Sequence, residues 1–269
     1  MRKKNLFSKA ILSIICVLVA PQAHARPIPF YLPLSVDQFP NISSKLETAL
    51  AEAGLSQFSV KTTDYWHPYQ QGLRQGRNGV YFAAPHFAAW SILKNKFVPI
   101  FRIQSELQYV IVARRADSAI FEVNDLAGKT VCTERAPNLD FLLSRTALEK
   151  ALILARTKNV KSVFFAMTDD DKSCQAFSIS RHIFEHFAKS EPFRFIRLQQ
   201  SEPSKNYSFV LDQSTASVHG LALEKFLRSS KAQTILEPMY KLYSTSPTLM
   251  RVKTKDYEEQ DYAPLLNYW

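Results

Sequence analysis

The sequence predicts an α/β protein of two lobes, each with a mainly parallel sheet flanked by helices. Segments with strand-like and helix-like patterns alternate along the chain, which is typical of folds built from βαβ units. The chain has 269 residues, a length that suits two lobes of ordinary domain size. Its hydrophobic fraction of 46% is typical of globular proteins.

The first 25 residues have the pattern of an export signal. A basic start precedes an apolar run of 11 residues, Ala10–Ala20, which is too short to span a bilayer. The small residues Ala23 and Ala25 then mark a cleavage site. We therefore expect residues 1–25 to be a signal peptide and the mature chain to begin at Arg26 in the periplasm. An uncleaved membrane anchor is the alternative.

The strands and helices expected in the first half follow one another with short connections. A first strand, Ile28–Leu34, precedes a helix that Asn41 and Ser43 can cap and that Gly54 stops after Ala53. The further elements are the strand Phe58–Lys61, a helix between Asp64 and Arg74, the strand Val80–Ala83, the helix His86–Leu93, and the strands Val98–Ile103 and Gln108–Arg114.

The second half continues the alternation, and a polar segment, Gln199–Asn206, has the length of a crossover rather than of a domain tether. The elements expected before this crossover are the strand Thr130–Cys132, the helix Leu139–Ala155, the strands Ser162–Ala166 and Gln175–Ser178, the helix Ser180–Lys189 and the strand Phe193–Leu198. Those expected after it are the strand Phe209–Leu211 and the helices Thr215–Arg228, Ala232–Tyr240 and Asp256–Leu266.

Three segments resemble one known family. Asn124–Lys129 reads NDLAGK before a short strand and resembles the D-L-x-G-K-x-V crossing of type 2 periplasmic substrate-binding proteins, in the phosphate/phosphite/phosphonate-binding ABC transporter family. Asp64–Trp90 and Ile235–Leu265 are similar to a cleft-wall segment and a closing segment of that family. The resemblance implies two lobes joined by two hinge crossovers, with residues 26–112 and 205–269 in lobe one and residues 113–204 in lobe two.

The sequence departs from this family where the family binds its ligand. An aspartate of the family's G-x-x-D strand has no match, and Asn78 and Gly79 stand near its place. The loop after the first strand of lobe two, rich in serine and threonine in the family, reads TERAPN from Thr133 to Asn138. Tight specificity for a phosphonate therefore does not carry over.

The expected ligand site lies between the lobes, where loops follow strands. Lobe one should contribute Tyr65, Trp66 and the turn Ala84–Pro85–His86, because helix amides and imidazole after a strand can meet an anion. Lobe two should contribute Thr133, Arg135 and Asn138, since arginine can hold a carboxylate or phosphate bidentately. The alternative is that the two aromatic residues belong to the core and that Arg135 is a surface charge.

The mature chain has two cysteines, Cys132 and Cys174. A lone pair in an oxidising compartment commonly forms a bridge, and the family resemblance implies that the strands carrying these two residues are neighbours. We expect a Cys132–Cys174 disulfide, with two buried free thiols as the alternative. Neither cysteine has a base near it in sequence, so a catalytic role is not expected.

Other motifs do not indicate catalysis. His182–His186 matches the H-x-x-E-H string of some zinc peptidases, but its apolar residues fit a packed helix face, and we expect no metal site there. Asp169–Asp171 fits a helix start better than a cation site. With six glycines in the chain, no glycine-rich phosphate loop is present. We expect no cofactor and no enzymatic activity.

The expected function is capture of a small, anionic ligand, with phosphorus-containing anions among the candidates, for an inner-membrane ABC permease. The formal net charge of +10 falls to +6 without the leader, which has four basic and no acidic residues. Basic residues are scattered and do not alternate with aromatic ones, so no nucleic-acid partner is expected. A monomer is expected. The alternative is a periplasmic sensing or partner-binding protein that reports to a separate membrane receptor.

Overall fold

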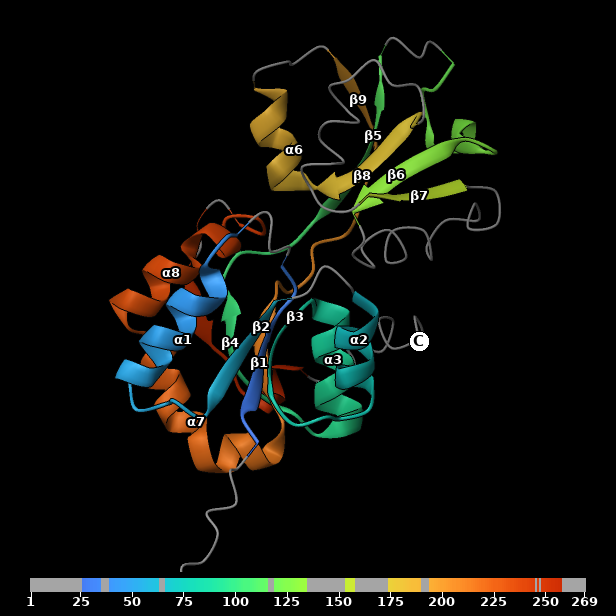
Figure 1. Ribbon diagram of the computed structural model, residues 1–269. Coiled ribbons are helices and arrows are strands. Elements are labelled where there is room, and N and C mark those ends of the chain that lie inside the picture. The colour runs from blue at the N-terminus through green and yellow to red at the C-terminus, as the bar shows by residue number, and fades with distance from the viewer. Residues whose placement is uncertain are drawn as a thin grey trace, which may run out of the picture.

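The computed structural model contains two separate β-sheets (Figure 1). It describes residues 26–34, 39–62, 66–115, 119–134, 153–157, 174–189, 194–244, 246 and 248–257. We call the six-stranded sheet with its helices lobe one, and the five-stranded sheet with its helix lobe two. Lobe one has the strand order β11 (Leu249–Arg251), β4 (Val98–Ile103), β10 (Ser208–Leu211), β3 (Val80–Ala83), β1 (Ile28–Leu32) and β2 (Phe58–Thr62). Lobe two has the order β7 (Ile153–Thr157), β6 (Thr130–Glu134), β8 (Ala176–Ser180), β5 (Tyr109–Arg114) and β9 (Phe195–Gln200).

The predicted α/β fold of two sheets flanked by helices is confirmed, and both sheets contain parallel and antiparallel pairings. β1 pairs in parallel with β2 and β3, and β6 pairs in parallel with β7 and β8. The remaining described pairings are antiparallel. Apart from the pairing of the edge strand β11 with β4, the antiparallel pairings arise because the chain passes between the lobes twice. β5 enters lobe two and β10 returns to lobe one, and each runs opposite to the strands beside it.

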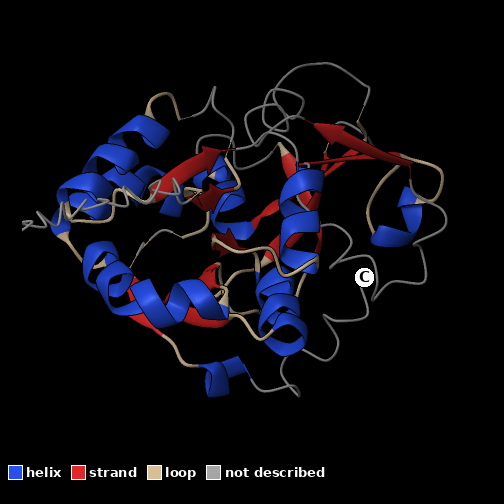
Figure 2. Cartoon of the chain, turned by 60° about the horizontal axis from the view of Figure 1, so that its bottom comes forward, coloured by secondary structure: helices blue, strands red, loops and turns tan. Residues whose placement is uncertain are grey.

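Helices cover both faces of the sheet in lobe one (Figure 1; Figure 2 gives a second view). On one face lie α1 (Ile42–Glu52) and α8 (Ser230–Tyr240), which pack against each other, with α7 (Gln213–Leu227) beside α8. On the other face lie α2 (Trp66–Arg74) and α3 (Pro85–Asn95). In the described ranges, no helix has the length and apolarity needed to cross a bilayer.

The core of lobe one is aromatic where its strands meet α8. The ring of Phe82 on β3 lies 4.7 Å from that of Phe209 on β10 and 5.9 Å from that of Tyr240 on α8, measured between centroids. All three side chains are fully buried. Aromatic pairs at these separations add to the free energy of burial. In lobe two, α6 (Arg181–Ala188) packs Phe184 against one face of the sheet, in a smaller cluster that contains Phe177.

The disulfide between Cys132 and Cys174 is confirmed. The two Cα atoms are 5.6 Å apart, and each residue is 2% exposed. Cys132 lies in β6, and Cys174 precedes β8, the neighbouring strand. The bridge therefore ties the start of β8 to β6 within lobe two.

Most element positions agree with the prediction, and three do not. The helix expected at Leu139–Ala155 is wrong at its end, because Ile153–Thr157 forms β7 along β6; residues 139–152 lie outside the described residues. The edge strand β11 was not predicted. Thr254–Tyr257 forms a 3₁₀ turn, η2, where a helix was expected from Asp256. The rest of that expected helix lies outside the described residues, as do the expected strand Ser162–Ala166, the expected signal peptide and Asp169–Asp171.

Candidate functional site

Two crossovers join the lobes side by side. The chain leaves β4 at Ile103 and enters β5 at Tyr109, and it returns between β9 and β10. The crossovers pair with each other: the Leu107 amide donates to the Ser204 carbonyl at 2.8 Å, and the Ser204 amide donates to the Leu107 carbonyl at 2.9 Å. All of β5 lies in the sheet of lobe two, whereas the expected division at residue 112 assigned most of it to lobe one. The expected division at residue 204 falls within the return crossover.

A buried asparagine anchors the return crossover. Asn206 has no exposed surface, and its Nδ2 donates to the Tyr243 carbonyl at 2.8 Å and to Ser105 Oγ at 3.2 Å. Its Oδ1 accepts from the Tyr207 amide at 2.7 Å. A buried amide with all these bonds made fixes the backbone around it. Both crossovers are thus held to the segment that follows α8.

The strands of both lobes end toward these crossovers. β4 ends at the first crossover, and β3 is antiparallel to β10 as β4 is, so β3 and its parallel neighbours also end there. β5 begins at the crossover, and β8 is antiparallel to it, so β8 and its parallel neighbour β6 end there too. Two carboxyl edges therefore face each other across the hinge. Ligand sites in α/β proteins lie at such edges.

In lobe one, the turn Ala84–Pro85–His86 lies at this edge, between β3 and α3. Pro85 takes the first position of α3, and no side chain caps that helix. His86 is 7% exposed, and burial lowers its pKa to about 3, so the imidazole is neutral near pH 7. It can therefore exchange a hydrogen bond with a ligand but cannot supply a charge. Tyr65 lies outside the described residues; Trp66 begins α2, and its side chain is likewise not described.

In lobe two, Thr133 lies near the end of β6 and is 3% exposed. Arg135 and Asn138 lie outside the described residues. Of the predicted site, the structure thus places Ala84, Pro85 and His86 at one edge and Thr133 at the other.

The prediction missed two buried serines on the sheet of lobe two, Ser178 and Ser180. Ser178 on β8 lies opposite Thr133 on β6, and on its other side lies Ile111 of β5, which in turn lies opposite Gln199 of β9. Ser180, two residues further, shares the face of Ser178. The alternation of serine in AFSIS, Ala176–Ser180, was the available signal: polar residues at a period of two in a strand that is buried throughout.

The edge of lobe one also carries a cation that the prediction missed. Arg102, the last residue but one of β4, lies opposite Ser208 of β10 and Met250 of β11. Its Nη2 donates to Met250 Sδ at 3.1 Å, and among the described residues it forms no ion pair. Its Nε is buried without a hydrogen-bond partner in that same part of the chain. This guanidinium therefore has donors to spare.

On the other side of the hinge the lobes touch through α6 and α8. His182 Nε2 lies 3.1 Å from the carbonyl oxygen of Lys241, at the end of α8. Burial lowers the pKa of His182, while hydrogen bonds and Glu185 oppose that effect. Glu185 accepts from Arg181 Nε at 2.6 Å. His182 and Glu185 therefore make separate contacts, and the described residues contain no group of three or more potential metal ligands.

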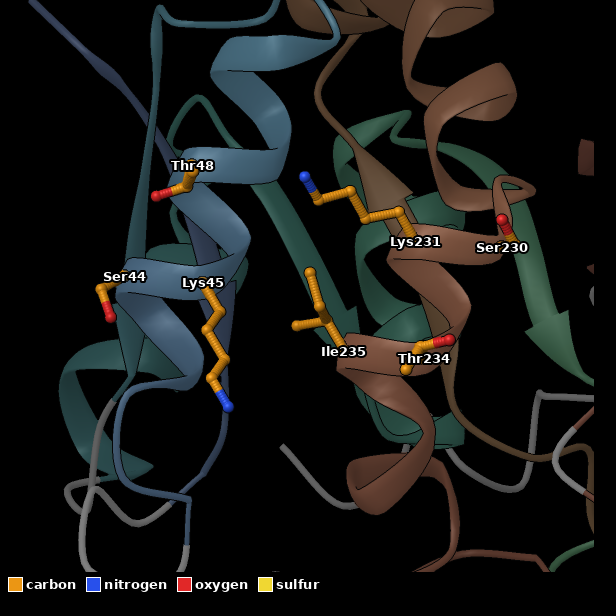
Figure 3. A pocket seen from close by; sticks show the side chains of 7 residues that line it. All are labelled: Ser44, Lys45, Thr48, Ser230, Lys231, Thr234 and Ile235. Atoms are coloured by element: carbon orange, nitrogen blue, oxygen red, sulfur yellow. The ribbon is translucent and has the colours of Figure 1, made fainter.

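A groove of about 550 Å³ lies between α1 and α8, away from the hinge (Figure 3). Lys45 projects from α1 and Lys231 from α8, and Ile235 lies between the helices. Lys231 forms an ion pair with Glu52. The groove contains none of the predicted ligand-binding residues, and its polar groups are exposed rather than convergent.

Comparison with known proteins identifies the fold. No family model and no curated sequence matches the chain. PhnD1 of Prochlorococcus marinus in complex with methylphosphonate superimposes with a TM-score of 0.66 over 90% of this chain and 100% of that chain, at 11% identity. This chain has the type 2 periplasmic binding protein fold. A Xanthomonas citri protein bound to ATP gives a TM-score of 0.64 at 12% identity, over 90% of this chain and 95% of that one.

Two further structures with this fold come from proteins of different function. A binding-protein component of an ABC phosphonate transporter from Pseudomonas aeruginosa gives a TM-score of 0.62 at 11% identity, over 89% of this chain and 93% of that chain. A histidine kinase sensor domain that resembles periplasmic binding proteins gives a TM-score of 0.50 at 16% identity, over 81% of this chain and 96% of that one. The same two-lobed architecture thus occurs in transport and in sensing.

Proposed function

We propose that this chain is a periplasmic solute-binding protein that captures a small anionic ligand between its lobes and delivers it to an ABC importer. The observation that carries the proposal is the pair of carboxyl edges facing each other across two crossovers. Binding proteins of this architecture close on a ligand by hinge motion. The Prochlorococcus and Pseudomonas proteins support a phosphorus-containing ligand, since the first is bound to methylphosphonate and the second is a component of a phosphonate transporter.

The proposed binding residues come from both lobes, with the division at the two crossovers, between β4 and β5 and between β9 and β10. Aromatic residues would cover an apolar part of the ligand, while the cation of lobe two and helix amides would hold its anionic part. Lobe one provides Tyr65, Trp66, Ala84, Pro85 and His86, and lobe two provides Thr133, Arg135 and Asn138. Since the His86 imidazole is neutral, the positive charge that balances the anion would come from Arg135.

The proposed location follows from the leader-like first 25 residues, with Arg26 as the first residue of the mature chain. Intact-mass analysis of the exported protein checks this step. A chain that retains residues 1–25 in a membrane fraction contradicts it.

Ligand identification is the decisive experiment. Protein purified from its native host without refolding is denatured, and the small molecules it releases are measured by mass spectrometry. The affinity of inorganic phosphate, methylphosphonate and ATP is then measured by calorimetry for wild type, Trp66→Ala and Arg135→Ala. Each substitution should weaken binding by at least about tenfold, about 1.4 kcal/mol. Unchanged affinity in both variants places the pocket elsewhere, and absence of any bound solute contradicts capture.

A second candidate function is ligand sensing for a separate membrane receptor. The similarity to a histidine kinase sensor domain favours it, although the TM-score is lower than those of the transport proteins. Deletion of the gene separates the two: loss of ligand uptake indicates transport, whereas intact uptake with a lost transcriptional response indicates sensing.

A further inference from the structure

Two serine hydroxyls in lobe two are buried without a partner. Ser178 is 2% exposed and Ser180 is 7% exposed. In the part of the chain that the structure describes, neither Oγ has a hydrogen-bond partner. Burying an unpaired hydroxyl costs on the order of 1–3 kcal/mol, so most buried hydroxyls in proteins are paired. Two such groups, two residues apart on one strand and unpaired among the described residues, are donors that a bound molecule could use.

These hydroxyls share one face of the sheet, at its hinge-facing end. Phe177 and Ile179 of β8 belong to the cluster under Phe184 of α6. Because side chains alternate along a strand, Ser178 and Ser180 point to the face away from α6. Ser180 is the last residue of β8, and that end of the strand lies at the crossover.

Arg102 lies on the corresponding side of lobe one. Phe82 and Phe209 turn their rings toward Tyr240 of α8. The residues that follow Phe82 and precede Phe209, namely Ala83 and Ser208, therefore point to the opposite face, which α2 and α3 cover, and Arg102 lies opposite Ser208. Since α6 and α8 touch each other on one side of the hinge, the serines and Arg102 both lie on the other side.

We propose that Ser178 and Ser180 donate hydrogen bonds to the oxygens of a phosphate or phosphonate group, whose charge Arg102 balances from the opposite lobe. Hydroxyls donate to oxyanions in short, charge-assisted bonds, and a guanidinium matches the geometry of a phosphoryl group. The assignment rests on the proposed capture function and deepens it. It also explains how an anion could be held where the loop Thr133–Asn138 has a single hydroxyl, that of Thr133, in place of the serine- and threonine-rich loop of the family.

Calorimetric titration with inorganic phosphate, methylphosphonate and ATP tests the assignment in the full mature chain. Ser178→Ala and Ser180→Ala should each weaken the anion that wild type binds by about tenfold or more, and Arg102→Ala should weaken it further. Arg102→Lys should restore part of the loss, because it keeps the charge without the planar fork. Thermal unfolding of the ligand-free serine variants should show no decrease in Tm, since each removes a hydroxyl that has no partner.

Ser91→Ala is the matched control. Ser91 is fully buried in α3, and its Oγ donates to the Ala88 carbonyl at 2.9 Å, so its loss should lower the Tm and leave the dissociation constant unchanged. If wild type binds an anion and both serine variants bind it equally well, the assignment is wrong while capture stands. A lowered Tm in both serine variants, as in Ser91→Ala, also overturns it. If wild type binds none of the three anions, phosphorus-anion capture and the assignment fail together.

Discussion

Replacing Asp212 with alanine tests how lobe one is held together at the end of its sheet remote from the hinge. Asp212 is 5% exposed and precedes α7. Its Oδ1 caps the helix by accepting from the Thr215 amide at 3.1 Å, and its Oδ2 accepts from the Gly79 amide at 2.7 Å, before β3. One carboxylate thus satisfies donors on two elements, and the Gly79 donor is 133 residues away from Asp212 in sequence.

The magnitude follows from these two roles. Loss of a helix cap costs about 1 kcal/mol, and leaving the buried Gly79 amide unpaired costs about 1–3 kcal/mol more. Asp212→Ala should therefore lower the free energy of unfolding by about 2–4 kcal/mol, measured by urea denaturation. Ser229→Ala is the control, because Ser229 caps α8 through a single bond from the Ala232 amide at 3.2 Å and should cost about 1 kcal/mol.

The pH dependence gives a second readout. Burial raises the pKa of Asp212, but hydrogen bonds from Ser214, Thr215 and Gly79 outweigh burial and hold the pKa below its ordinary value of 3.8. A carboxyl group whose pKa is lower in the folded state stabilises the fold above that value and loses the contribution as the pH falls. The difference between wild type and Asp212→Ala should thus shrink below about pH 4. Equal destabilisation by Asp212→Ala and Ser229→Ala would refute the two-element role.

Three further perturbations have expected outcomes. Cys174→Ser opens a loop with a sequence separation of 42 and should lower the free energy of unfolding of lobe two, measured by urea denaturation, by about 4 kcal/mol in the chain-entropy account. Reduction of the wild-type bond to Cys132 should do the same, and a loss under about 1 kcal/mol contradicts this. Burial keeps the His86 imidazole neutral in the folded state, so the unfolded state binds the proton first and the free energy of unfolding should fall by about 2 kcal/mol between pH 7 and pH 5. His86→Gln should flatten this fall. An unchanged slope of the free energy of unfolding against pH contradicts the reasoning. His182→Ala removes a contact between lobes and should broaden the interlobe distances measured between nitroxide labels; an unaltered distribution shows that the contact does not restrain the hinge.

Local sequence signals sufficed where the determinants of an element are local. Val80–Ala83 and Val98–Ile103 have the predicted bounds, because each is a short apolar run between strong breakers or polar residues. The disulfide was predictable because residues 26–269 contain one pair of cysteines. The crossing segment Asn124–Lys129 also precedes a strand of lobe two, as its resemblance implied.

Partners distant in sequence decided the rest. Ile153–Thr157 has apolar residues that fit a helix or a strand, and its pairing with β6 selects the strand. Ser178 and Ser180 could be assigned to a strand from sequence, but their burial depends on what covers the sheet. Likewise, nothing near Arg102 in sequence indicates that its Nε would be buried, since the residues beside it come from β10 and β11.

In the proposed function, the groups on one side of the hinge favour the present arrangement of the lobes, and those on the opposite side favour closure on a ligand. On the side of α6 and α8, the contact between His182 and the Lys241 carbonyl favours the lobe arrangement seen here, and a hydrogen bond of this kind contributes on the order of 1 kcal/mol. On the opposite side, Ser178, Ser180 and Arg102 have donors that are unpaired among the described residues. A ligand can shift such an equilibrium only by its difference in affinity between the two arrangements. An oxyanion that pairs all three groups gains most when the lobes approach, so the buried unpaired donors raise the free energy of the empty form and the ligand removes that cost.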